Sequence, residues 1–500
     1  MRDSWDYKTN ISGRAIPKTQ NAQTGALSPS YVRGALFQGP LNDSQLYTYG
    51  GTNFLGNSSF PGWVPQNSEQ YSLWAYGITT QSWKKYDVTT GSPQRPNYGA
   101  YAEAPSLGLA FYLNGQLDVG SSAVSSALGN ATEHLDGMIT MDTVSQKARN
   151  ASTSTLGKPR VGGGLQFIEN LGADGVLVAM GGMQRSGDGK SNELISFDHV
   201  NLCEDFTGNN LTWYRQATSG DIPKSRTDFC LVTASAPDNS SYNIYLYGGI
   251  DVINGNRTMY DDVYALSLPS FRWTHMYGPG QYPRWGHTCH LVGNRQMVTV
   301  GGSLNASVYN IETTTQQSNI SDIECDWEWA AVAILDLSDI KWSSAFNAYA
   351  SPYQVPISIF SAIGGGQNGG ANLTAPPGGF ADPAVSAMFQ ARPTASPGGT
   401  AGTKPGNDRG VIAGVVIGSL AGLYIFIGII FGVLRYNKRI AIKDAQIAEL
   451  EQRECERLPC PELTCDWSKF ELDNEGHIPE MGGGIVIQEL EVDEQRLELA

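Results

Sequence analysis

The densest group of chemically versatile side chains in this sequence is the run His287-Thr288-Cys289-His290. Imidazole and thiolate groups are good ligands for zinc and copper, so this run is the first place to look for a bound metal. We expect the run to form a strand, and two residues three apart on a strand point to opposite faces of the sheet. We therefore predict no metal ion here, and we predict no cofactor or catalytic residue elsewhere.

Other signatures of chemistry are missing from the sequence. It has no glycine-rich phosphate loop, no serine in a nucleophile elbow and no paired acid motif. The net charge of −15 also argues against nucleic acid as a partner, because a phosphate backbone is bound by a basic surface. We therefore expect a binding function, which depends on the elements that present the surface.

Residues 223–273 contain four short apolar segments separated by turn residues. The segments are rich in β-branched and aromatic residues, which is typical of antiparallel strands joined by turns. They are 229–232, 242–247, 262–266 and a last segment that carries Trp273. The second segment ends on Gly248-Gly249, where paired glycines let the backbone turn with a positive φ.

This four-strand pattern recurs along the chain at a spacing near the period of about 50 residues known for one class of repeat. Each copy has a strand that ends on Gly-Gly and a later tryptophan, except for a degenerate copy that ends on Asn114-Gly115 and has no tryptophan. The other copies cover 46–83, 109–115, 159–213 and 282–342. Recurrence of one unit predicts an all-β fold built from similar sheets.

These units resemble kelch repeats, in which Gly-Gly closes the second strand and a Tyr and a Trp stand on the third and fourth. The resemblance implies a kelch-type β-propeller over residues 1–366, with six or seven four-stranded blades. Nearly the whole chain is similar to fungal kelch-repeat membrane proteins. In that family a secretion signal comes first, and Trp5 resembles the end of a blade whose first strands are missing. We therefore expect the first blade to be truncated.

The resemblance also implies two kinds of enzyme with which the chain must be compared. Kelch-type rings include copper radical oxidases of the galactose oxidase kind, which use Tyr and His ligands and a Cys crosslinked to Tyr. Plant specifier proteins with a kelch ring hold iron through Glu, Asp and His at spacings of four. Nothing here matches the first pattern, and Glu193, Asp198 and His199 do not reproduce the second spacing.

Several residues near the starts of the repeats have two interpretations. Asp228, Arg284 and Trp285 could line the mouth of a central channel. Arg226 and Arg284, however, stand at matching points of two repeats. We therefore favour a structural role for these two arginines, in which they bond neighbouring loops.

Asparagine sequons and cysteines indicate the compartment. Asn-X-Ser/Thr motifs are dense before residue 411 and absent after it, which predicts a glycosylated ectodomain. The candidate sites are Asn10, Asn42, Asn57, Asn130, Asn150, Asn210, Asn239, Asn256, Asn305, Asn319 and Asn372.

The predicted ectodomain contains the cysteines Cys203, Cys230, Cys289 and Cys325. Four cysteines permit three pairings, between which sequence does not choose, and reduced buried thiols are the alternative. We favour Cys203–Cys230 and Cys289–Cys325, because the latter two fall in one repeat. Cys455, Cys460 and Cys465 lie in the tail, where a reducing cytosol would keep them free.

The residues after the repeats divide into three segments. Residues 367–410 are rich in Gly and Pro and predict a flexible stalk. Residues 411–434 have no charge and are long enough to span a bilayer. Basic residues follow them, so the positive-inside rule places the acidic tail 435–500 in the cytosol and the repeats outside. Small residues four apart, Gly414, Gly418 and Gly422, permit a homodimer through this helix.

Fold alone does not give function. We expect a non-enzymatic recognition protein in the plasma membrane or another secretory-pathway membrane, which binds a protein or a cell-wall polysaccharide through its propeller loops. The alternatives are a galactose-oxidase-like or carbohydrate-active enzyme and a structural tether between wall and membrane.

Overall fold

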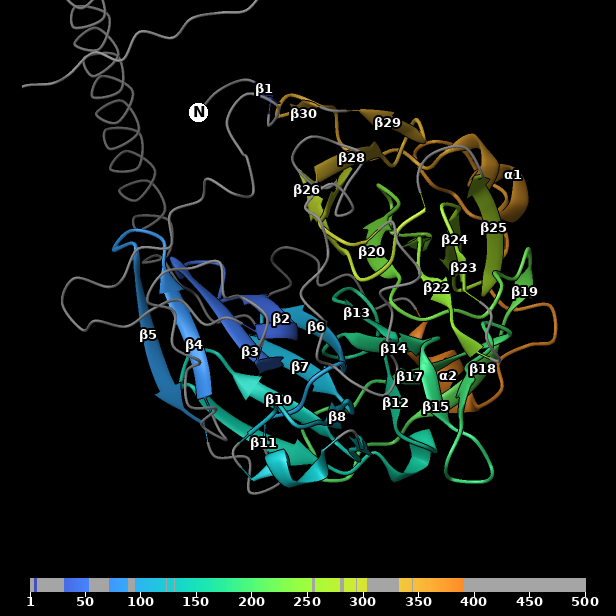
Figure 1. Ribbon diagram of the computed structural model, residues 1–500. Coiled ribbons are helices and arrows are strands. Elements are labelled where there is room, and N and C mark those ends of the chain that lie inside the picture. The colour runs from blue at the N-terminus through green and yellow to red at the C-terminus, as the bar shows by residue number, and fades with distance from the viewer. Residues whose placement is uncertain are drawn as a thin grey trace, which may run out of the picture. The chain divides into compact units, whose positions relative to one another are not determined.

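The computed structural model is an all-β protein with few helices, and its strands form a series of small, mostly antiparallel sheets (Figure 1). The residues that the structure describes are 4–6, 31–53, 72–88, 95–122, 124–129, 131–253, 257–278, 283–293, 295–303, 332–343 and 345–390.

Five sheets, each a meander of consecutive antiparallel strands, make up most of the described chain. Sheet 1 consists of β2 (Tyr31–Gln38), β3 (Gln45–Asn53), β4 (Ser72–Gly77) and β5 (Ser82–Asp87). Sheet 2 consists of β6 (Ala100–Ala104), β7 (Leu109–Leu113), β10 (Met138–Asp142) and β11 (Lys147–Ala151). Sheet 3 consists of β13 (Gly164–Ile168), β14 (Val176–Met180), β17 (His199–Cys203) and β18 (Tyr214–Ala217).

The two remaining large sheets follow the same order. Sheet 4 consists of β20 (Cys230–Ser235), β21 (Tyr242–Tyr247), β24 (Val263–Leu268) and β25 (Arg272–Tyr277), and β19 (Ser219–Gly220) joins β25 in parallel. Sheet 5 consists of β26 (Thr288–Val292), β27 (Gln296–Val300), β28 (Val332–Asp336) and β29 (Lys341–Ser343).

Short strands between these sheets form small ladders in the connecting loops. They are β8 (Gln116–Leu117) with β9 (Glu133–His134), β12 (Arg160–Val161) with β15 (Met183–Arg185) and β16 (Asn192–Leu194), and β22 (Ile250–Asp251) with β23 (Thr258–Met259). The 3-10 helices η2 (Ser125–Leu128) and η3 (Ser154–Leu156) lie in the loops before and after sheet 2's last two strands.

The strands that the repeat pattern predicted are present where it placed them. The segments predicted at 229–232 and 242–247 are the paired strands β20 and β21, and Trp273 lies on the fourth strand, β25. The degenerate copy that lacks a tryptophan still folds as sheet 2. The repeat pattern therefore located the sheets correctly.

The number of sheets differs from the predicted number of blades. The described residues contain five sheets with four-strand meanders rather than six or seven, plus one isolated pair formed by β1 (Ser4–Asp6) and β30 (Ala345–Asn347). In that pair Trp5 lies opposite Phe346, so a segment near residue 5 pairs with the segment that follows sheet 5. The prediction that Trp5 belongs to a sixth blade stays a prediction.

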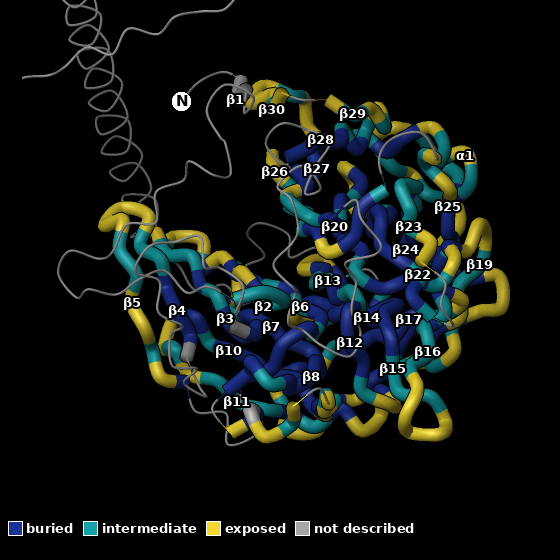
Figure 2. Tube along the Cα trace, in the orientation of Figure 1, coloured by how far each residue is buried: buried dark blue, intermediate teal, exposed yellow. Residues whose placement is uncertain are grey.

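The hydrophobic core is divided into clusters that lie between neighbouring sheets. Trp273 shows how such a cluster forms: its side chain is fully buried, its ring meets Phe197 of the preceding unit edge-on at 5.7 Å, and its indole N–H donates to the Phe197 carbonyl at 3.1 Å. In Figure 2 the middle strands β14, β17 and β24 are dark blue, whereas the edge strand β5 carries exposed residues. Large aromatics thus fill the space between sheets.

Glycines at the end of the second strand join sheets 1 to 4 each to the next sheet. Near the end of the second strand of sheets 1 to 4, a glycine amide donates a hydrogen bond to a carbonyl just before the first strand of the following sheet. These bonds are Gly51 to Pro96 (2.8 Å), Gly115 to Arg160 (3.2 Å), Gly182 to Arg226 (3.2 Å) and Gly249 to Arg284 (2.8 Å). At Gly182, φ is 87°, and a Cβ would lie 2.6 Å from the backbone of Val161 and Gly163. Glycine is therefore required there.

Buried arginines stand at the same point of four sheets. Arg95, Arg160, Arg226 and Arg284 are all less than 5% exposed. The Arg226 guanidinium donates to the Gly248 carbonyl at 3.1 Å and pairs with Asp262, and the Arg284 guanidinium donates to Gly301 at 3.3 Å. The structural role favoured for Arg226 and Arg284 thus agrees with their position, because each one donates to the Gly-Gly pair at the end of its own sheet's second strand. We call this pair the glycine corner of the sheet.

The segment after sheet 5 corrects the predicted domain boundaries. Helix α1 (Ile357–Ile363) packs against β24 and β25, and helix α2 (Pro383–Met388) buries Val385 and Met388 in the core between sheets 3 and 4. Residues 367–390, predicted to belong to a flexible stalk, are therefore folded onto the sheets. Apolar residues at the correct helical spacing were hidden among the prolines and glycines that suggested a linker.

The other predicted features of the C-terminal part lie outside the described residues. These are the spanning segment 411–434, the small-residue face Gly414, Gly418 and Gly422, and the tail 435–500. Within the described part of the chain, no helix has the length and hydrophobicity needed to cross a bilayer.

Candidate functional site

A pocket of about 580 Å³ lies between the first strands of the five sheets. β2, β6, β13, β20 and β26 contact one another in that order, and all five contribute lining residues. Strands from all five large sheets thus converge on one cavity, whose size falls in the range of small-molecule sites. We treat this pocket as the candidate functional site.

One part of the pocket is lined by a collar of five residues, one in or just before the first strand of each large sheet. The collar consists of Arg33, Tyr98, Gly162, Asp228 and Gly286, which all have a positive φ between 56° and 69°. Their backbones are linked in sequence: each amide donates to the carbonyl of the preceding collar residue at 2.8–3.0 Å. Four hydrogen bonds therefore tie the five sheets together around the pocket.

Three collar residues are not glycine, although a positive φ is unfavourable for side chains such as those of Arg and Tyr. The Tyr98 side chain contacts both of the others. The Arg33 guanidinium lies 4.1 Å from the centre of the Tyr98 ring, and the Tyr98 hydroxyl donates to the Asp228 carboxylate. Burial, and then the Asp228 charge, raise the pKa of Tyr98 well above its usual value. The phenol thus stays protonated and acts as a hydrogen-bond donor.

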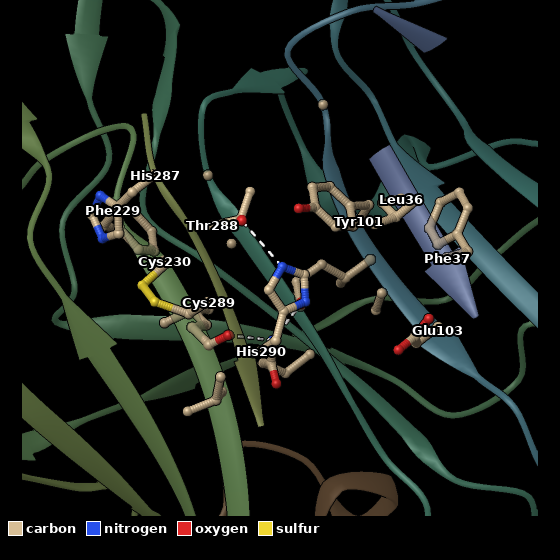
Figure 3. A pocket seen from close by; sticks show the side chains of 18 of the residues that line it. Leu36, Phe37, Tyr101, Glu103, Phe229, Cys230, His287, Thr288, Cys289 and His290 are labelled. Carbon is tan, nitrogen blue, oxygen red and sulfur yellow. Dashed lines mark hydrogen bonds between the residues drawn. A yellow bond between two sulfur atoms is a disulfide. The ribbon is translucent and has the colours of Figure 1, made fainter. Parts of the chain in front are cut away.

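Phe37, Tyr101 and Glu103 form a second group in the pocket (Figure 3). The Phe37 and Tyr101 rings meet edge-on with centroids 5.9 Å apart, and the Glu103 carboxylate accepts a hydrogen bond from the backbone N–H of Gln38. Burial raises the pKa of Glu103, and burial together with Glu103 raises the pKa of Tyr101 to about 12. This group offers aromatic surface beside one acidic side chain.

Thr288 and His290 of sheet 5 form a third group in the same pocket (Figure 3). The Thr288 hydroxyl and a ring nitrogen of His290 are 3.1 Å apart, and burial lowers the pKa of His290. The imidazole is therefore biased toward its neutral form, in which it can both donate and accept a hydrogen bond.

The predicted disulfide pairing is wrong. Cys230 bonds to Cys289 with 5.5 Å between their Cα atoms, and Cys203 is a buried free thiol. Cys230 and Cys289 stand on the first strands of adjacent sheets, which run side by side, whereas Cys203 lies on the third strand of sheet 3 within the core between sheets 2 and 3. Cys325 lies outside the described residues. The assumption that a disulfide closes one repeat therefore gave the wrong pairing, because the bond joins two repeats.

The structure places the other sequence-derived candidates as follows. Asp228 lines the pocket, as considered, but Arg284 and Trp285 are buried away from it. Among the sequons, Asn150 is half-buried on β11, and four are exposed: Asn42, Asn210, Asn239 and Asn372. The remaining sequons, Asn10, Asn57, Asn130, Asn256, Asn305 and Asn319, lie outside the described residues.

Sequence reasoning missed Glu103, Tyr101 and every collar residue except Asp228. Tyr101 and Glu103 belong to the degenerate copy, whose weak repeat signal drew no attention to its first strand. The sequence does contain a pattern that marks the collar. In four of the sheets the collar residue follows the buried arginine (Arg95, Arg160, Arg226 or Arg284) by two or three residues.

Comparison with known proteins adds one informative relative. The chain is 30% identical, over 431 residues, to a kelch repeat-containing protein of Arthroderma benhamiae, and the match covers 75% of this chain. The chain is a homologue of a kelch repeat-containing protein. It spans 58% of the length of that relative.

The solved structure of YjhT matches with 16% identity and a TM-score of 0.42, over 64% of this chain and 86% of the solved chain. No protein-family model matches the chain. The all-β architecture and the kelch relative are consistent with a kelch-type β-propeller.

Proposed function

We propose that this chain is a non-enzymatic recognition protein that binds its ligand in the pocket between the first strands. The observation that carries the proposal is the convergence of five sheets on one cavity that combines aromatic surface with hydrogen-bonding groups. Ligand sites in proteins are concave, mainly apolar and furnished with a few well-placed polar groups.

The pocket favours the end of a polysaccharide chain over a flat protein surface. Tyr101, which packs on the buried Phe37, presents ring surface, and Glu103, Thr288 and His290 present donors and acceptors within one cavity. Sugars carry both an apolar face and many hydroxyl groups, so this combination suits them. A loop of a surface protein is the alternative ligand.

We place this recognition at the cell surface. Dense sequons, four of which are exposed in the described part, and the uncharged segment 411–434 support a glycosylated ectodomain on a single membrane span. A homodimer through Gly414, Gly418 and Gly422 belongs to the same proposal.

Binding of wall polysaccharides to the full purified chain tests the proposal. Tyr101→Ala and Glu103→Gln should each weaken binding at least tenfold, whereas Glu133→Gln, an exposed acid away from the pocket, should not change it. Competition with a surface-protein extract would show the alternative ligand. Equal binding by all variants would place the ligand outside the pocket and contradict the proposal.

An enzyme remains the second candidate because Glu103 is a half-buried carboxyl in a pocket, and its pKa is raised by partial burial, as the pKa of acid catalysts often is. A carbohydrate-active enzyme would release product from oligosaccharides and lose turnover in Glu103→Gln. A galactose-oxidase-like enzyme would contain copper and show a radical absorbance. A structural tether, the third candidate, would tolerate deletion of residues 435–500, whereas a signalling receptor would not.

A further inference from the structure

Three potential metal ligands from two sheets meet beside the pocket. They are Cys230 at the start of β20, His287 just before β26, and Cys289 on β26 (Figure 3). One ligand atom of each residue lies within 4.8 Å of the other two. This group differs from the His287–His290 run considered in the sequence, because its third member comes from the neighbouring sheet.

His287 lacks the hydrogen bonds that a buried imidazole normally makes. Its side chain is 5% exposed, and neither ring nitrogen has a hydrogen-bond partner of normal geometry among the described residues, although the Tyr247 backbone lies near. The ring packs edge-on against Tyr247 at 5.1 Å. Buried polar groups without partners are rare and call for an explanation. His290 provides the contrast, because it is paired with Thr288.

We propose that Cys230, Cys289 and His287 form a redox-controlled site for a thiophilic metal ion such as Zn²⁺. In the oxidised state the two sulfurs form the disulfide and the site is closed. In the reduced state the two thiolates and the imidazole supply three ligands, a set that zinc accepts with a fourth position open. All three residues line the pocket, so the fourth position is accessible from it.

The chemistry balances with a dithiol as the reductant. The dithiol transfers two electrons and two protons to the Cys230–Cys289 bond and becomes a cyclic disulfide. Metal binding then displaces the two thiol protons to solvent. Zinc–sulfur bonds of about 2.3 Å place two sulfurs about 3.8 Å apart, which side-chain rotation can reach from Cα atoms 5.5 Å apart.

The site has a consequence for the fold in both states. The disulfide links sheets 4 and 5 when oxidised, and the metal would link the same two strands when reduced. The connection between the two sheets would therefore survive a change in redox state, provided that metal is present.

Cobalt spectroscopy tests the proposal, since Co²⁺ bound by thiolates gives an intense charge-transfer absorption. The full chain is used with its tail cysteines and Cys325 replaced by serine, so that they contribute no thiolate. It is reduced with a dithiol, freed of reductant without oxygen and titrated with Co²⁺, and thiol counting verifies that two thiols have appeared. We expect one Co²⁺ per reduced chain, displaced by Zn²⁺, and no band for the oxidised chain.

Variants separate the three ligands from their neighbours. Cys289→Ser should abolish the band, His287→Gln should weaken Co²⁺ binding about tenfold or more, and His290→Gln should leave it unchanged. Circular dichroism checks that each variant folds. If His287→Gln does not fold, Cys289→Ser alone tests the proposal. A verified reduced chain without a thiolate band, or a band that persists in Cys289→Ser, would overturn the proposal.

Discussion

At the scale of single residues, the buried arginines hold loops and strands together through several contacts each. Arg226 is fully buried, donates to the Gly248 carbonyl, pairs with Asp262 and lies 3.7 Å from the centre of the Tyr260 ring. A planar guanidinium makes these contacts simultaneously, whereas a lysine ammonium cannot.

Arg226→Lys should therefore lower the free energy of unfolding by about 3 kcal/mol. Urea unfolding followed by tryptophan fluorescence measures the change. The exposed Lys224 supplies the control, since Lys224→Ala should stay within about 0.5 kcal/mol of the parent. An unchanged midpoint for Arg226→Lys would show that the guanidinium contacts are dispensable.

Acid should destabilise the fold partly through His134. Burial, and then the Arg185 charge, lower the pKa of His134 from 6.5 to about 4. Since the unfolded chain binds this proton more readily, the contribution of His134 to stability is fully present above pH 6.5 and is lost as the pH falls toward 4.

His134→Gln should make the free energy of unfolding less dependent on pH, by about 3 kcal/mol between pH 6.5 and pH 4. Unfolding midpoints at a series of pH values measure the effect. The exposed His275→Gln is the matched control and should keep the parent profile. Parallel profiles for the parent and His134→Gln would contradict the assignment.

Residue types predicted structural roles better than site roles. Arg226 and Arg284 could be assigned from their matching positions, because a repeat aligns residues that do the same job. Glu103 and Tyr101 could not, since only the convergence of sheets far apart in sequence shows that they share a cavity with His290. The disulfide failed for a related reason, because it joins two repeats rather than closing one.

At the scale of elements, the glycine corners determine how one sheet meets the next. Gly182 has a positive φ, and a Cβ there would collide with backbone atoms of Val161 and Gly163. Gly187, a few residues later, has open space around the same position.

Gly182→Ala should therefore lower the free energy of unfolding by more than about 2 kcal/mol, because the added Cβ strains a close backbone contact. Gly187→Ala should be nearly neutral. Thermal unfolding of the two variants side by side provides the comparison. Similar melting temperatures would mean that the corner can open without cost.

Helix α2 should stabilise the junction of sheets 3 and 4. Met388 is 1% exposed and packs with the core between these sheets. Met388→Ala should cost about 2–4 kcal/mol, as expected for a buried large-to-small substitution, and the exposed Gln390→Ala should cost almost nothing. Limited proteolysis should also cleave the segment just before residue 390 faster in Met388→Ala than in Gln390→Ala. Equal cleavage of both variants would argue against this packing.

The strands could be predicted from sequence because their signals are local: apolar runs, turn residues and glycine pairs. The helix α2 could not, since six residues with Pro at their start resemble a linker until their partner surface is known. The pair β1–β30 also escaped prediction, because it joins segments more than three hundred residues apart.

At the scale of the whole molecule, the topology predicted from the sequons and the segment 411–434 remains the proposal with the widest consequences. Treatment of the natively produced chain with an N-glycosidase should lower its apparent mass strongly. A tag after Ala500 should remain protected from external protease in intact cells. An unchanged mass would mean that the sequons are not used and would move the search for ligands to another compartment.

In the collar, the main chain links the sheets and the side chains line the pocket. Its hydrogen bonds are formed by the main chain alone, so they survive when a collar side chain is exchanged. Only residues that tolerate a left-handed backbone can enter these five places, which restricts the choice chiefly to Gly, Asn and Asp, with rarer cases such as Arg33 and Tyr98. An exchange within this restricted set would thus change the side chains that line one part of the pocket while the hydrogen-bonded framework stays the same.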